Sequence, residues 1–357
     1  MLFGLNENTT VVAIEEMVVP AHLAESFEGI AALGNMKAEK LYEEVLNIQG
    51  EFTAKLQRGI STGKLDEACT ELLQEGALGN FFGKVKEMFK KLWEAIKAIF
   101  AKFMTWLDSK IKSDKDFIAK YKKTLMAKVG EVSDMEYKGH NWNLGEIPGK
   151  VTEEVKKTVE ETEKTTENLL KKDIVDPKTG YAPRLTHATA DKDSKMAGFF
   201  EAKADGSDRE QLIEDGIKLI AGALGLGQLT DPAEVVSEYR EKIYGGSVEA
   251  ETLTGPKVGE LIKVVEEYSK DKSAAEKALK SYEKVFNDTV KTLEKLEKEA
   301  SKADSTSVNL STSTLIAVAK AQASLANQIA GVYLAALKDR RDEARAILAK
   351  VVTYKKK

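Results

Sequence analysis

Apolar side chains recur at every third or fourth position through most of the chain, which is the spacing of one face of an α-helix. Residues 81–112 give the clearest pattern, because one face is apolar and lysines occupy most of the other. The apolar face holds Phe81, Val85, Met88, Phe89, Leu92, Ile96, Ile99, Phe100, Phe103, Trp106 and Leu107. The lysines are Lys84, Lys86, Lys90, Lys91, Lys97 and Lys102. Residues 21–60 and 64–75 follow the same spacing and predict two or three further helices.

The middle of the chain is predicted to alternate between helix and irregular structure. Ser113 is a suitable N-cap, so a second helix is expected to begin after it. Residues 133–147 interrupt the helical pattern and are expected to form a short extended excursion. Residues 148–172 indicate a polar helix with one thin apolar seam, and residues 173–206 indicate an irregular linker.

Helical spacing returns over residues 208–225 and 232–244, and the longest periodic stretches follow. Residues 257–302 carry a near-heptad apolar seam, and residues 312–352 predict a second long helix with many alanines. We predict that these two form an antiparallel α-hairpin; an exposed seam that binds a partner is the alternative. In the hairpin, Leu279, Tyr282, Phe286 and Leu293 are expected to be buried against Leu315, Leu325, Ile329, Val332 and Leu337.

These elements predict an all-α, multi-helix protein with four sections. They are an acidic helical section (1–75), a basic amphipathic unit (76–147), a polar helix with a linker (148–206) and a C-terminal helical domain with the long hairpin (207–357). More than half of all residues are expected to be helical.

Charge adds a local contrast to this picture. The chain has 357 residues and a formal net charge of −4, so the total charge gives no reason to expect nucleic-acid binding. Residues 1–80 carry 13 acidic and 5 basic side chains, whereas residues 81–128 carry 13 basic and 5 acidic ones. The acidic section is therefore expected to neutralise the basic one.

Cys69 is the single cysteine, so no intrachain disulfide can form. It is expected to be a small buried side chain in a protein made in a reducing cytosol. Near the N-terminus, Glu7, Glu15 and Glu16 interrupt the apolar run that a secretion signal needs, so no such signal is expected. No stretch of 18 residues is free of charges, so no membrane-spanning helix is expected either.

Residues with catalytic or ligand-binding potential are sparse. The three histidines are far apart, and the sequence motifs of zinc proteases, α/β-hydrolases and P-loop proteins are missing. The glycine-rich residues 222–229 follow a helical pattern, which indicates a helix C-cap and not a nucleotide loop. His140, flanked by Tyr137 and Trp142, could stack on a ligand or belong to a packed surface cluster. We expect no enzymatic activity, no cofactor, no metal and no small-molecule substrate.

Two short segments resemble the sites that head-maturation proteases of T4-like tailed bacteriophages cleave. Such sites combine Leu or Ile, any residue, Glu and then a small residue. One match comprises Leu73, Glu75 and Gly76, at the boundary between the acidic and basic sections, and the other lies in KLDEACT at residues 64–70. Cleavage after Glu75 would separate an acidic pro-segment from a basic mature protein and unmask its lysine face.

A wider resemblance rests on KSDKDFIAKYKKTLMAKV followed by MEYKGHNWNL, and on the C-terminal ANQIAGVYLAALKDRRDEARAILAKVVTYKKK. These segments resemble helical head-internal or minor virion structural proteins of large contractile-tailed (T4-like) bacteriophages. His140 departs from the pattern, since such proteins often have an aromatic residue there. The resemblance implies a non-enzymatic structural or assembly protein of the head or prohead interior, made in the host cytoplasm, with other virion proteins and packaged DNA as partners.

A membrane-active helical protein is the alternative interpretation. Residues 81–112 combine the lysine-rich polar face and the Phe, Trp and Leu apolar face of an interfacial helix. A core helix whose lysines face water has the same pattern. Packaged DNA and an anionic bilayer therefore both remain candidate targets of the basic face.

Overall fold

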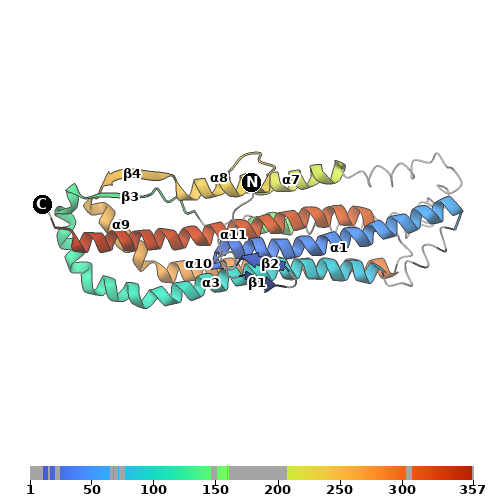
Figure 1. Cartoon of the computed structure of the whole chain (residues 1–357), viewed down its shortest axis with the longest axis horizontal. Coiled ribbons are helices and arrows are strands. Elements are labelled where there is room, and N and C mark those ends of the chain that lie inside the picture. The colour runs from blue at the N-terminus through green and yellow to red at the C-terminus, as the bar shows by residue number, and fades with distance from the viewer. Residues whose placement is uncertain are drawn as a thin grey trace.

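The computed structural model of the chain describes residues 11–14, 17–20, 25–64, 67, 71, 77–145, 151–158, 160, 207–302 and 308–355. It is an elongated bundle in which the long helices run side by side (Figure 1). The long helices are α1 (Phe27–Thr62), α3 (Ala77–Ala127), α10 (Tyr268–Lys302) and α11 (Val308–Thr353). The shorter ones are α7 (Ser207–Ala223), α8 (Pro232–Tyr244) and α9 (Gly255–Glu266). Together they hold more than half of the chain, so the predicted all-α class is confirmed.

Helix α11 lies at the centre of the bundle. Helices α1, α3, α7, α8 and α9 all pack against it, and most of its side chains between Ile316 and Leu337 are buried. Apolar residues and alanines surround this part of α11 on every side, which is the pattern of an enclosed helix. Gly331 lets α1 approach closely, because a Cβ at this position would lie 3.2 Å from the carbonyl oxygen of Phe27.

Helix α1 is an integral part of the core. Gly34 marks its closest approach to α3, because a Cβ there would lie 2.1 Å from the Cβ of Ala95. Phe27 and Ala31 are buried, and the ring of Phe27 meets that of Phe103 in α3 edge to face at 6.1 Å. The N-terminal acidic section thus supplies a helix on which the packing of α3 depends.

Of the two or three helices predicted over 21–60 and 64–75, the structure describes one unbroken helix of 36 residues, and most of residues 64–75 lie outside the described residues. Helix α1 ends at Thr62, and Gly63 follows with a φ of +68°, a left-handed conformation that favours glycine.

Helices α10 and α11 run antiparallel, as predicted (Figure 1), since Tyr282 contacts Ala326 and Asp271 contacts Arg341. However, α10 packs chiefly against α3. The expectation that Phe286 is enclosed by α11 was wrong, because Phe286 is only partly buried and stacks on Trp93 of α3 at 5.4 Å. Tyr282 does reach α11, where its hydroxyl donates a hydrogen bond to the carbonyl of Ala326 at 3.3 Å.

The other side chains predicted to meet across this hairpin show a similar mixture. Five of them are buried, namely Leu293, Leu325, Ile329, Val332 and Leu337. Leu279 is partly buried, and the side chain of Leu315 is not among those described.

Helix α3 is continuous over 51 residues, so the break predicted at Ser113 was wrong. Ser113 lies inside this helix, and the carboxylate of the neighbouring Asp114 turns into the bundle and pairs with Arg341 and Arg345. The long stretch predicted over 257–302 is divided instead, since α9 ends at Glu266 and α10 begins at Tyr268.

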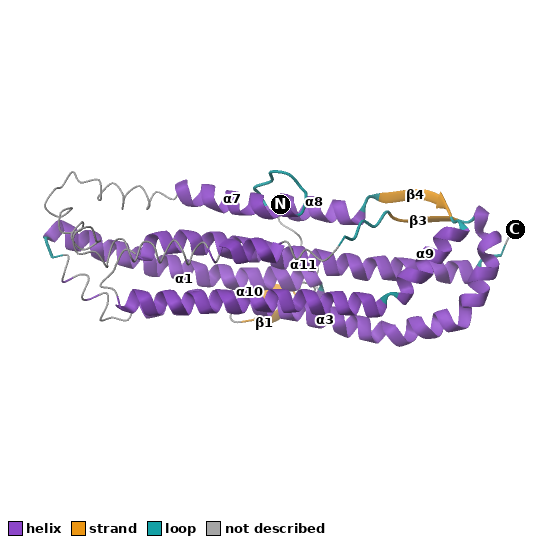
Figure 2. Ribbon diagram, turned by 180° about the vertical axis from the view of Figure 1, so that it is seen from behind, coloured by secondary structure: helices purple, strands orange, loops and turns teal. Residues whose placement is uncertain are grey.

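Two short antiparallel strand pairs accompany the described helices. β3 (Glu136–His140) pairs with β4 (Ser247–Thr252) at the end of the bundle that holds α9 and the C-terminus (Figure 2). β3 lies within the excursion predicted at 133–147, whereas its partner β4 was not predicted. β1 (Val11–Ile14) and β2 (Met17–Pro20) form the second pair, which was also not predicted.

Several helix ends carry the signals expected from the sequence. The side chain of Asp231 caps α8 by accepting a hydrogen bond from the backbone N–H of Ala233 at 2.9 Å, and Pro232 follows the cap. After α7, Gly225 and Gly227 adopt positive φ values of 69° and 82°. The glycine-rich residues 222–229 are therefore a helix C-terminal turn, as predicted.

Candidate functional site

The apolar face of α3 is part of the bundle core. Every apolar side chain predicted to share this face is buried, except Trp106, which is partly buried. Helices α1, α10 and α11 cover the face. An interfacial role for α3 would therefore require this face to leave the core.

Two lysines of the predicted basic face make ion pairs with other helices. Lys84 lies 2.7 Å from Glu44 of α1, and this hydrogen bond raises the pKa of Lys84. Lys86 lies 2.7 Å from Glu297 of α10. The acidic section thus supplies a counter-charge to Lys84, as expected, whereas Lys86 takes its partner from the C-terminal half.

The remaining four lysines differ in exposure, since Lys90 and Lys97 are exposed and Lys91 and Lys102 are partly buried. Lys90 and Lys91 lie 4.0 Å and 3.5 Å from Glu94 of the same helix. Lys97 is exposed and Lys102 is partly buried, and neither forms an ion pair with another residue in the described ranges. The six lysines are therefore not one continuous free surface.

The proposed processing residues Leu73, Glu75 and Gly76 lie outside the described residues, as does Cys69. The structure nevertheless constrains what cleavage would do, because α1 lies on the N-terminal side of this junction and is packed into the core. Separation of residues 1–75 would remove a core helix as well as acidic charge.

A fully buried arginine lies where α3, α9, α10 and α11 meet. Nη1 of Arg341 lies 3.6 Å from Oδ2 of Asp114, and Nη2 lies 3.2 Å from Oδ2 of Asp271. Nη1 also donates a hydrogen bond to the carbonyl of Val265 at 2.6 Å. The ring of Tyr268 lies 5.6 Å from the guanidinium. We call Arg341, Asp114 and Asp271 the polar node.

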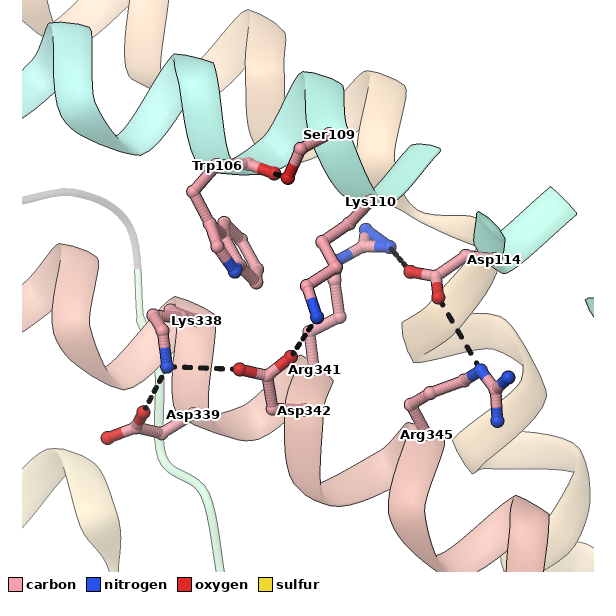
Figure 3. Close-up of polar contacts among 9 residues, drawn as sticks. All are labelled: Trp106, Ser109, Lys110, Asp114, Lys338, Asp339, Arg341, Asp342 and Arg345. Carbon is pink, nitrogen blue, oxygen red and sulfur yellow. Dashed lines mark hydrogen bonds and ion pairs between the residues drawn. The ribbon is translucent and has the colours of Figure 1, made fainter. Parts of the chain in front are cut away.

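Charged side chains extend from the polar node towards the surface of α3 and α11 (Figure 3). Nε of Arg345 lies 3.5 Å from Oδ1 of Asp114, so two arginines share this carboxylate. Lys110 and Lys338 converge on Asp342 at 3.8 Å and 3.0 Å. The outer pairs are exposed to water and contribute about 0–1 kcal/mol each, whereas the node itself is desolvated.

Burial dominates the protonation chemistry of the polar node. It raises the pKa of Asp114 and of Asp271, and the nearby Arg341 charge opposes this shift. Burial also lowers the pKa of Arg345. The node was missed from the sequence, because the DRRDEAR segment of α11 has the composition of a solvated helix surface and no local signal marks Arg341 as buried.

His140 belongs to a packed cluster at the junction of β3, α8 and α11. Its Nδ1 lies 2.7 Å from Oε2 of Glu343, and Nε1 of Trp142 donates to Oε1 of the same carboxylate at 2.9 Å. The rings of His140, Trp142 and Tyr244 pack with centroid distances from 4.7 to 5.6 Å. Of the two roles considered for His140, the structure places it in the packed cluster.

Within the described ranges, no group of His, Cys, Asp and Glu side chains is arranged to hold a metal ion. None of the described helices has an apolar stretch long enough to cross a membrane. No family model, curated protein or solved structure matches the chain.

Proposed function

We propose that the chain is a non-enzymatic structural or assembly protein of a phage head or prohead interior, made in the host cytoplasm. The resemblance of the α3, β3 and α11 segments to head-internal and minor virion proteins supports this role. Other virion proteins and packaged DNA are its partners in the proposal.

The observation that carries the proposal is the elongated bundle around α11. The long helices place their apolar faces inside, so the outer surface that they present along the molecule is mainly charged. Such a surface suits an extended element that contacts neighbours through charge, and the effect of those contacts should weaken as salt is added.

We further propose that cleavage after Glu75 matures the protein. The structure changes the expected consequence, because α1 remains held by Phe27 and Ala31 in the core and by the ion pair of Glu28 with Arg240. Cleavage alone would leave α1 bound, and full exposure of the basic face would need a further event that removes it.

A mass-spectrometric inventory of purified virions and proheads from the native source tests both proposals. The chain should be present in the head fraction, and a semi-tryptic peptide that starts at Gly76 should accompany it if processing occurs. Absence of the chain from both particles would overturn the structural role. Presence of intact peptides across the Glu75–Gly76 bond, without the Gly76 terminus, would overturn processing alone.

A further inference from the structure

Six lysines form a straight row on the outer face of α10. These lysines are all exposed and are spaced three, four or seven residues apart. They are Lys277, Lys280, Lys284, Lys291, Lys295 and Lys298. At about 100° per residue they fall within about 60° of arc. At about 1.5 Å per residue the row is about 30 Å long. We call this row the lysine stripe.

The stripe faces away from the bundle because the opposite side of α10 is buried. Ala275, Tyr282, Thr289 and Leu293 are buried on that side, and α3 is the main neighbour of the helix. The position of the stripe is therefore set by the packing of the apolar seam, and not by the flexible lysine side chains themselves.

Most lysines of the stripe differ from the α3 lysine face, where ion pairs occupy several of the side chains. No ion pair or hydrogen bond joins the side chains of five of its six lysines, all except Lys295, to any other part of the chain that the structure describes. Glu297, which faces the other way, is already paired with Lys86. Asp288 lies beside the row, between Lys284 and Lys291.

The two sides of the stripe differ in charge. On one side, a cavity of about 260 Å³ is lined by residues of α10 and of the helical stretch 151–158 and 160, and its lining includes Lys156, Lys291 and Lys295 as well as Asp288. Glu160 also lines it and pairs with Lys156 at 3.4 Å. On the other side, Glu276, Glu283 and Glu294 form a row of exposed carboxylates. An anion would therefore approach from the side of Lys156.

The described part of α10 has no exposed large hydrophobic side chain, which favours some classes of partner over others. Among the described side chains, the exposed large hydrophobic residues are Met36, Met126, Leu212 and Leu219, and none of them is on α10. Insertion of a helix into the membrane interface needs an apolar face as well as cations, and a stable protein interface has a buried, largely apolar centre. Phosphate neutralisation needs cations alone.

We propose that the lysine stripe binds the phosphate backbone of double-stranded DNA without sequence preference. The stripe is about as long as one turn of the duplex, about 34 Å, so several lysines can meet phosphates on one contact. The inference rests on the proposed function, which identifies the DNA as the packaged genome. The stripe on α10 is a different surface from the predicted lysine face of α3.

The test is fluorescence anisotropy of a labelled 30-base-pair duplex with the full-length chain, between 50 and 200 mM NaCl. With four to six phosphates neutralised, the logarithm of the binding constant should fall with the logarithm of salt at a slope of about −4 to −5. The triple variant Lys277→Gln/Lys284→Gln/Lys291→Gln should bind the duplex at least about tenfold more weakly at 50 mM NaCl. The magnitude of its salt slope should be smaller than that of the wild-type chain by about 2.5 to 3.

The matched control is Lys97→Gln/Lys102→Gln/Lys112→Gln, which removes the same charge from α3. Circular dichroism and the melting temperature establish that both variants fold. Retention of most DNA affinity by the control supports the stripe. Equal loss in both variants, or no DNA binding by the wild-type chain, overturns it.

Two further experiments test whether the stripe binds an anionic membrane or a second copy of the chain instead. Binding to phosphatidylserine-containing vesicles but not to the duplex would overturn the DNA proposal in favour of a membrane. Self-association that the stripe variant abolishes, without DNA binding, would overturn it in favour of a second copy. DNA binding that depends on the stripe, in a chain that is missing from purified particles, would overturn the proposed function. It would still support DNA binding by the stripe.

Discussion

The guanidinium of Arg341 and the carboxylate of Asp114 lie 3.6 Å apart inside the bundle, with only 2% and 4% of their side chains exposed. Removing such charges from water is unfavourable, and their attraction offsets this only while every partner is in place. Asp271 and the carbonyl of Val265 are the other partners of this guanidinium, whereas its buried Nε has no hydrogen-bond partner among the described residues. A shifted α11 would bury the arginine without these partners, so the polar node favours one register of the helices.

Replacement of Arg341 by Met should lower the free energy of unfolding by about 3–5 kcal/mol, because two buried carboxylates lose their shared cation. Urea denaturation followed by circular dichroism measures the change. Arg340→Met is the control, since Arg340 is partly exposed and lies 3.9 Å from Glu267; it should change the same quantity by about 0–1 kcal/mol. Similar effects of both substitutions would show that the node makes no special contribution.

Two glycines of α1 should respond to alanine in opposite directions. Gly34→Ala places a methyl group against Ala95 of α3, and this overpacking should destabilise the protein by about 1–3 kcal/mol. Gly50 is exposed, with no atom near its added Cβ, so Gly50→Ala should stabilise it by about 0.5–1 kcal/mol through higher helix propensity. Thermal melts of both variants test the pair, and a neutral Gly34→Ala would contradict the close α1–α3 contact.

The packing of α10 on α3 can be measured through Trp93 and Phe286. Their rings lie 5.4 Å apart with an interplanar angle of 13°, which is a stacked arrangement. A double-mutant cycle with Trp93→Ala and Phe286→Ala should give a coupling energy of about 0.5–1.5 kcal/mol. Additive effects of the two substitutions would place Phe286 against a different helix.

Cleavage at the proposed junction should not release α1 by itself. If residues 72–76 are replaced by the recognition sequence of a specific protease, both fragments of the cut protein should elute together on size exclusion in native buffer. The ion pair of Glu39 with Lys320 and the hydrogen bond of Asn327 to Asn35 hold α1 to α11 in addition to the apolar core. Elution of the α1 fragment at its own size would mean that cleavage alone unmasks the basic face.

The buried tyrosines predict loss of stability at alkaline pH. Burial and a hydrogen bond to Glu251 raise the pKa of Tyr137 to about 12, and burial raises the pKa of Tyr239, Tyr244 and Tyr282 well above the ordinary value of about 10. The folded state holds these protons more tightly than the unfolded state. Their contribution to stability is therefore complete below about pH 10 and is lost as pH rises through the raised values.

Absorbance at 295 nm during a pH titration checks this expectation. The chain has 10 tyrosines, and Tyr137, Tyr239, Tyr244 and Tyr282 should ionise only above pH 10, together with the loss of helical circular dichroism. Tyr137→Phe should remove one late-titrating phenol. Ionisation of all ten as one group near pH 10, in a chain that is still helical, would rule out the burial of these side chains.

Much of the secondary structure follows from local spacing. The apolar face of residues 81–112 became the buried face of α3, and the signals around Pro232 and Gly225 mark real helix ends. Each of these properties depends on residues within a few turns of one another, so the sequence carries them directly. One error has a long-range origin: Ser113 looked like an N-cap, but it lies inside α3, and Asp114 beside it is held by arginines more than 200 positions away.

The candidate sites could be predicted from the sequence less well than the helices, because they depend on contacts between helices in the assembled bundle. The lysine face of α3 was visible in the sequence, but its division into paired and free lysines required the positions of Glu44 and Glu297. The lysine stripe of α10 is also present in the sequence as a three-and-four spacing and was not predicted, because its exposure depends on the packing of the opposite face of α10 against α3.

The sequence by itself determined that the chain forms long amphipathic helices, because helical periodicity is a property of each segment alone. Tertiary structure decided which faces meet: α10 lies on α3, α11 is enclosed at the centre, and Arg341 is buried although its neighbours in the sequence are charged. The physical reason is that burial and ion pairing arise from contacts between distant segments. A periodic pattern shows that a face needs a partner, whereas packing geometry selects that partner.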